Sequence, residues 1–143
     1  MLDRHRVAFA VYLLIERDSE ILLLRRANSG WNDGKYTLVA GHVDAGESAR
    51  TAMVREAAEE VGISLGQEDL DLVHTMYRND RDPYVDLYFR ATRWSGEPRI
   101  MEPDKAGDLR WFPVGSLPSE LVSTVRSALS CIQSGNIYSE DGW

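Results

Sequence analysis

The sequence has a single cysteine and no long hydrophobic run. With Cys131 alone among 143 residues, no disulfide can form within the chain. The main apolar run, residues 7–15, falls far short of the roughly 20 residues that a transmembrane helix needs. No small-residue cleavage site of the signal-peptide kind follows it. We therefore expect a cytoplasmic protein that does not bind a membrane.

The chain also has little positive charge. Its 16 basic residues stand against 23 acidic ones, which gives a net charge of -7 and a pI near 4.9. Nucleic-acid polymers and anionic membranes bind basic surfaces, so this composition argues against both as partners. A small anionic ligand stays compatible with the charge if a bound metal ion supplies the positive field.

The apolar patterning predicts a single α/β domain over residues 1–143, with a sheet flanked by helices. Residues 6–15 and 21–26 are expected to form a hairpin, and the first of these strands is apolar on both faces. Further strands are expected at 36–41, 71–78, 84–94 and 109–114. Amphipathic helices are expected at 48–61 and 117–133, and a short tail at 136–143.

Five carboxylates crowd into residues 41–63, and three of them share one face of the expected helix. Glu56, Glu59 and Glu60 are spaced i, i+3 and i+4, where like charges repel one another. The spacing predicts that they face outward, while an opposite apolar stripe packs on the sheet: Val54, Ala57, Ala58 and Val61. These three glutamates are called the glutamate ridge. Either the ridge binds Mg²⁺ or Mn²⁺, which prefer hard oxygen ligands, or it is a solvated acidic face with arginine partners.

The wider spacing resembles the Nudix box, the signature of the Nudix hydrolases. Gly41 is followed after five residues by Glu47, and after seven more by Arg55-Glu56; Glu59-Glu60 and Gly62 then complete the pattern. The segments "LLLRRA" upstream and "TRWSGEP" downstream are similar to parts of the MutT-type nucleoside triphosphate pyrophosphohydrolases. The resemblance implies the Nudix fold, a mixed β-sheet sandwiched between α-helices (α/β/α).

The resemblance also implies roles for the residues of the box. Glu56, Glu59 and Glu60 match its metal-binding carboxylates, and the Gly41 carbonyl is a further expected ligand. Arg55 matches the arginine that orients a glutamate through a salt bridge, and Glu47 is the expected partner. Glu56 is the first choice for the general base and Glu59 the second. Mg²⁺ is the expected cofactor, and Mn²⁺ is an alternative.

Residues outside the box are candidates for completing the site, each with a simpler explanation beside it. Glu102, in a loop after the strands, is a candidate metal ligand or a solvated acid. Arg25 or Arg26 would reach a substrate phosphate or lie at the surface. Trp31 and Tyr36 would stack on a base or serve ordinary packing.

Several features that distinguish Nudix subfamilies are missing. The sequence has Ala40 where many members have glycine. It also lacks the Pro/Trp/Phe-rich run of NADH diphosphatases and the proline of ADP-ribose hydrolases. By elimination, the expected reaction converts a nucleoside triphosphate to a monophosphate and pyrophosphate. The alternatives are a nucleoside diphosphate-sugar or other nucleoside diphosphate-X as substrate, or a non-catalytic nucleotide sensor, in a chain that is a monomer or a homodimer.

Overall fold

The computed structural model describes residues 3–143, so the first two residues of the domain expected over 1–143 lie outside it. The strands run in chain order as β1 Ala8–Leu14, β2 Glu16–Arg17, β3 Glu20–Arg26, β4 Tyr36–Thr37, β5 Val39–His42, β6 Leu70–Asp80, β7 Asp82–Ala91, β8 Ala106–Pro113 and β9 Tyr138–Asp141. The helices are α1 Ala49–Val61, a 3-10 turn at Gln67–Asp69, and α2 Ser123–Gln133. In this part of the chain no helix is long and apolar enough to cross a membrane.

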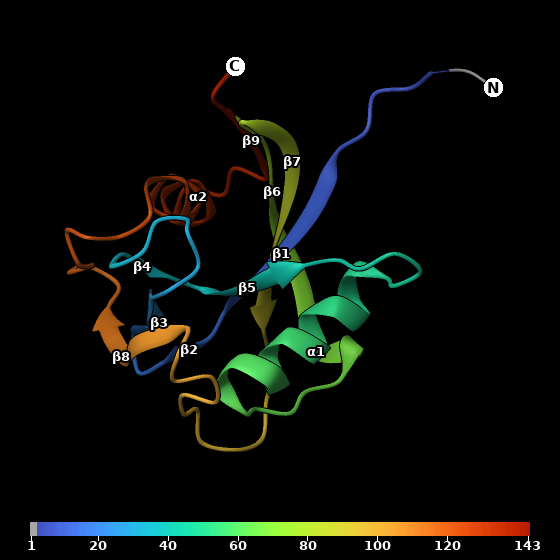
Figure 1. Cartoon of the computed structure of the whole chain (residues 1–143). Coiled ribbons are helices and arrows are strands. Elements are labelled where there is room, and N and C mark those ends of the chain that lie inside the picture. The colour runs from blue at the N-terminus through green and yellow to red at the C-terminus, as the bar shows by residue number, and fades with distance from the viewer. Residues whose placement is uncertain (1–2) are drawn as a thin grey trace.

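The strands form two sheets (Figure 1). The larger has the order β5-β1-β7-β6-β9 and is mixed, because β1 pairs parallel with β7 and antiparallel with β5. In the smaller sheet β3 pairs with β2, β4 and β8. The predicted α/β class and mixed sheet are confirmed.

Strand β1 divides the core into two layers, because successive side chains point to opposite faces. Val11 and Leu13 belong to the cluster that includes the buried face of α1, whereas Tyr12 and Leu14 belong to the cluster that includes α2. The prediction that this strand is apolar on both faces because both are covered is confirmed, and the two helices lie apart on either side of the strands (Figure 1).

The predicted hairpin between residues 6–15 and 21–26 is wrong. Both hydrogen-bonding edges of β1 are occupied, by β5 and β7, so β3 joins the other sheet. Only the two-residue β2 folds back on β3, through a turn at Asp18 and Ser19, both with positive φ. The strand expected at 36–41 is likewise split, with β4 in the smaller sheet and β5 in the larger.

The C-terminal part of the chain differs from prediction in two places. The second helix begins at Ser123 and not at residue 117, because the preceding backbone pairs with β4 through the Val122 N–H and the Tyr36 carbonyl, 2.9 Å apart. The expected tail forms strand β9, parallel to β6.

Candidate active site

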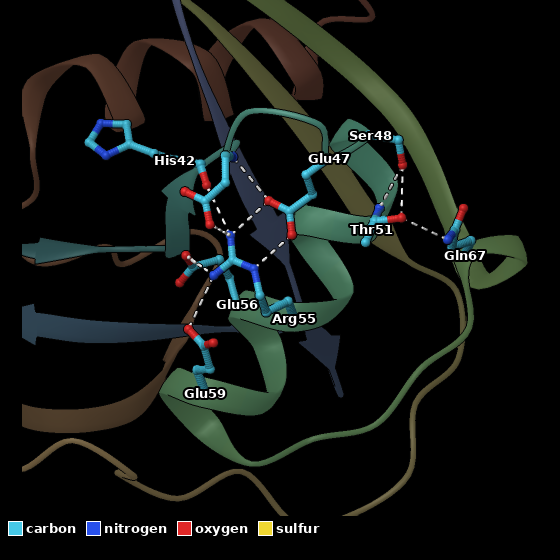
Figure 2. Close-up of polar contacts among 9 residues, drawn as sticks. His42, Glu47, Ser48, Thr51, Arg55, Glu56, Glu59 and Gln67 are labelled. Carbon is cyan, nitrogen blue, oxygen red and sulfur yellow. Dashed lines mark hydrogen bonds and ion pairs between the residues drawn. The ribbon is translucent and has the colours of Figure 1, made fainter.

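The acidic helix begins and ends where the sequence predicts. The Ser48 hydroxyl caps its first turn by accepting the Thr51 N–H at 3.1 Å (Figure 2). Gly62 ends the helix in the left-handed conformation. Its buried side chains are Ala52, Met53, Ala57 and Val61.

The orientation predicted for this helix is wrong in part. Val54 is only half-buried and Ala58 is exposed, so the buried stripe is turned toward the glutamates. As a result only Glu59 points outward, with its side chain 52% exposed, whereas Glu56 is 14% exposed. Small side chains at positions 52 and 57 let the helix approach the sheet closely, and this brings the carboxylates to β5.

Gly41 on β5 lies directly against Glu56. A Cβ atom at this position would overlap the Glu56 carboxylate, so only glycine leaves room for that side chain. The neighbouring Ala40 packs its methyl group on the core cluster that includes α2, and its N–H points at the Glu60 carboxylate, 3.5 Å away. The alanine that departs from the usual motif therefore does not disturb the contact between strand and carboxylate.

Arg55 ties the acidic residues together (Figure 2). Its Nε and Nη2 donate to both oxygens of Glu47, at 2.8 and 2.9 Å. Nη1 donates to Glu56 at 2.9 Å and to Glu59 at 3.2 Å, and Nη2 also reaches the His42 carbonyl at 3.1 Å. One guanidinium thus fixes the loop before the helix relative to two of the ridge carboxylates.

The surroundings of these carboxylates shift their pKa values in different directions. Hydrogen bonds from Arg55 and from the Asp44 backbone lower the pKa of Glu47 to about 2. Burial raises the pKa of Glu56 above 4.5, against the opposing effect of Arg55. Burial and the Glu56 carboxylate raise the pKa of Glu60 well above 4.5, and Glu102 adds to this effect.

These carboxylates fit a divalent cation. Glu56 and Glu60 are partly buried beside each other, and no cationic side chain is paired with Glu60 among the described residues. A bound cation would offset the repulsion between the two carboxylates. Residues 3–143 contain no group of three or more His, Cys, Asp or Glu side chains already arranged to hold a metal ion. An open site of this kind suits Mg²⁺, which keeps several waters and takes its remaining ligands from substrate phosphates.

The glutamate ridge forms part of a cleft of about 810 Å³. Among the residues predicted to form the site, the cleft brings together Arg26, Trp31, Gly41, Glu56, Glu59, Glu60 and Glu102. Arg55 and Glu47 lie behind the ridge and do not line the cleft. The cleft therefore contains an acidic helix face together with cationic and aromatic side chains.

The four residues proposed to bind substrate separate into two pairs. Arg26 and Trp31 lie together at the cleft, where the guanidinium is 4.8 Å from the ring centroid and its Nε donates to the Trp31 carbonyl at 2.7 Å. Tyr36 is buried, packs edge-on against Phe112 and donates its hydroxyl to Asp108. Arg25 bonds the Gly107 carbonyl at 3.4 Å outside the cleft.

The cleft contains residues that the sequence analysis did not single out, foremost Arg78 on β6. Its guanidinium is buried, pairs with Asp86 and lies 4.1 Å from the ring centroid of Tyr84. Asp80, two residues further along the strand, accepts the indole N–H of Trp31 at 2.8 Å. The sequence signal that could have identified Arg78 is a basic and an acidic residue, Arg78 and Asp86, on two strands joined by a tight turn.

The fold and the site define a class of hydrolase, and comparison with known proteins identifies the family. The chain belongs to the Nudix family, because the NUDIX domain model matches residues 4–129. Nudix hydrolases are pyrophosphohydrolases that act on small nucleotide-containing substrates and use divalent metal ions.

Individual relatives agree with this assignment. A MutT NUDIX hydrolase from Burkholderia pseudomallei is 32% identical with a TM-score of 0.81, over 88% of this chain and 98% of that one. The MutT protein of Methanosarcina mazei, 24% identical with a TM-score of 0.77 over 94% of this chain and 99% of its own, shares the fold. The NAD-capped RNA hydrolase NudC of Pseudomonas putida W619 is 33% identical over 119 residues, 79% of this chain. This chain spans only 39% of that relative's length.

Proposed function

We propose that the protein hydrolyses nucleoside triphosphates, with Mg²⁺ as cofactor, to a nucleoside monophosphate and pyrophosphate. The observation that carries the proposal is the cleft in which Glu56, Glu59 and Glu60 share one surface with Arg26 and Arg78. Such a surface provides oxygen ligands for a metal ion and positive charge for a polyphosphate. Mn²⁺ remains an alternative cofactor.

The metal ligands in this proposal are the three ridge glutamates, the Gly41 carbonyl and Glu102. When bound, a divalent ion polarises a phosphoryl oxygen and lowers the pKa of an attacking water. The chain itself supplies the base, for which Glu56 is the first choice, because burial raises its pKa toward the working pH. Glu59, more exposed, is the second choice.

Arg55 and Glu47 act as positioning residues in this mechanism. The two hydrogen bonds between them fix the plane of the guanidinium. The remaining Nη1 then directs the Glu56 carboxylate toward the cleft at 2.9 Å. A base held in one orientation transfers a proton without first losing conformational freedom.

The alternative substrate is a nucleoside diphosphate linked to another group, and the curated relatives favour it by name. The relatives from Pseudomonas are called NAD-capped RNA hydrolases. Two facts favour a triphosphate: the Burkholderia protein that this chain matches over 98% of its length is of the MutT type, and the Pro/Trp/Phe-rich run of NADH diphosphatases is missing here. The intact glutamates argue against a non-catalytic sensor.

Product analysis distinguishes these functions. The protein is incubated with Mg²⁺ and a panel of nucleoside triphosphates, NAD and nucleoside diphosphate-sugars, and products are separated by ion-exchange chromatography. A monophosphate plus pyrophosphate from a triphosphate supports the proposal. Two monophosphates from NAD or a sugar nucleotide, with triphosphates left intact, support the alternative. Binding without turnover supports the sensor.

Matched variants test the metal ridge in the same assay. Glu59→Gln and Glu60→Gln are expected to lower kcat by about 10²-fold or more, since removing groups that act in the transition state lowers kcat. Glu120→Gln is the control, because Glu120 is an exposed acid outside the cleft. Near-normal rates in the ridge variants contradict the assignment. Light scattering of the same samples separates the monomer from the homodimer.

A further inference from the structure

The C-terminal segment 136–143 lies outside the part of the chain that matches the family, residues 4–129. Its strand β9 pairs parallel with β6, from Thr75 opposite Tyr138 to Arg78 opposite Asp141 (Figure 1). Without this segment β6 would be the edge strand of the larger sheet. The segment therefore completes the sheet at the strand that carries Arg78.

Side chains fasten the segment at both of its ends. At its beginning, the buried ring of His74 bonds the Asn136 carbonyl through Nδ1 at 2.8 Å and the Ser139 hydroxyl through Nε2 at 2.7 Å. At its end, the indole N–H of Trp143 donates to the Tyr77 carbonyl at 3.0 Å, and the ring centroids of Trp143 and Tyr77 are 4.6 Å apart. Trp143 thus holds the backbone of β6 immediately before Arg78.

Close backbone packing continues beyond that point. A Cβ atom at Gly142 would overlap the Asn79 carbonyl, so the C-terminal chain lies directly on the backbone between Arg78 and Asp80. Side chains alternate along a strand. Tyr77 therefore meets Trp143 on one face, while Arg78 on the other face lines the cleft.

We propose that Trp143, by bracing strand β6, positions Arg78 and Asp80 in the cleft and so sets the affinity for the nucleotide. The proposal rests on the proposed function, since it assigns Arg78 and Asp80 to the substrate-binding surface. The ridge glutamates line the same cleft but belong to α1, a different element from β6. The brace therefore acts on substrate binding and leaves the hydrolytic step unchanged.

The test compares three variants of one segment. Trp143→Ala removes the ring contact and the hydrogen bond, whereas Trp143→Phe keeps an aromatic ring against Tyr77 and removes only the donor. Ile137→Ala is the control, because this side chain is 77% exposed. In steady-state kinetics we expect KM to rise about fivefold or more in Trp143→Ala, less in Trp143→Phe and not in Ile137→Ala, with kcat within twofold throughout.

Hydrogen exchange of the β6 amides gives a readout that needs no turnover. We expect faster exchange at residues 77–80 in Trp143→Ala than in the wild type and in Ile137→Ala. Unchanged KM in Trp143→Ala, a loss of kcat without a change in KM, or an equal effect of Ile137→Ala overturns the proposal. If the wild type hydrolyses no nucleotide, the proposed function fails, and exchange alone decides the brace: faster exchange supports it and unchanged exchange overturns it.

Discussion

Arg55 holds Glu47 with two parallel hydrogen bonds, 2.8 and 2.9 Å long, across the start of the acidic helix. The pair does not line the cleft, yet the same guanidinium contacts Glu56 and Glu59 with its free nitrogen. The arrangement explains how a row of like charges stays ordered on one helix: a single arginine compensates several of them.

The first prediction concerns the pH dependence of stability. The pKa of Glu47 is about 2 in the folded chain, against 4.5 when unperturbed. Because the folded value is the lower one, this pair contributes stability above pH 4.5, and the contribution is lost as the pH falls from about 4.5 to about 2. In Glu47→Gln this part of the acid dependence should be absent.

Urea denaturation at several pH values between 2 and 6 measures the effect. Glu120→Gln is the control, since this exposed acid makes no ion pair within the described part of the chain. The prediction is wrong if the unfolding free energy of Glu47→Gln falls with acid as steeply as that of the control.

A second prediction concerns the space beside Gly41. An added methyl group overlaps the Glu56 carboxylate, so Gly41→Ala must displace that side chain. A displacement of about 1 Å in a catalytic group can cost about 10²-fold in rate, and we expect kcat to fall by that order. Gly115→Ala, which meets nothing within 4 Å, is the matched control and should keep full activity. Equal rates in the two variants would show that Glu56 does not act where we place it.

The third prediction uses the raised pKa of Glu60. Because the folded pKa exceeds the unfolded one, ionisation of Glu60 destabilises the fold; this cost develops as the pH rises above 4.5 and is complete above the raised folded pKa. At pH 8, in EDTA, Glu60→Gln should therefore melt above the wild type, with each 1 kcal/mol of relieved cost raising the melting temperature of such a domain by roughly 4 °C.

Adding Mg²⁺ should reverse this order. Metal binding stabilises the folded wild type, and the variant lacks one of the proposed ligands. Differential scanning calorimetry with 0 and 10 mM Mg²⁺, roughly the range that saturates a weak site, measures both shifts. A wild type whose melting temperature does not respond to the metal, or a variant that melts lower in EDTA, contradicts the prediction.

The sequence predicted local features of the fold well and long-range ones poorly. The bounds of α1 follow from Ser48 and Gly62, whose effects depend only on neighbouring residues, and the structure confirms them. The predicted pairing of β1 with β3 is wrong because an alternating pattern shows which faces of a strand are buried but not which strands its edges pair with. The side of α1 that faces the sheet depends on packing against β5, which the helix sequence alone does not contain.

The candidate site divides in the same way. Glu56, Glu59, Glu60 and Gly41 lie close together because one helix and one short strand carry them, and a local motif can describe that. Arg78 enters the cleft from β6, a strand that local sequence does not place beside the glutamates. Recognising it requires the register of β6 and β7, where Arg78 stands opposite Tyr84.

The last prediction separates the stabilising and functional roles of Arg78. Asp86 is fully buried, and within residues 3–143 its Oδ1 has no hydrogen-bond partner, so the Arg78 ion pair is its main compensation. Arg78→Met leaves a buried charge alone and should cost about 3–5 kcal/mol in the free energy of unfolding. The double variant Arg78→Met with Asp86→Leu replaces the pair with apolar groups and should recover most of that loss.

Substrate affinity should not recover with stability. If Arg78 contributes to nucleotide binding, the double variant folds normally by circular dichroism yet retains a KM raised about tenfold, because the cation is still missing. Asp86→Leu alone serves as the comparison, since it keeps the cation and breaks the pair. Denaturant titration and steady-state kinetics on the same preparations give both quantities. A double variant with wild-type KM would assign Arg78 to the stability of the sheet alone.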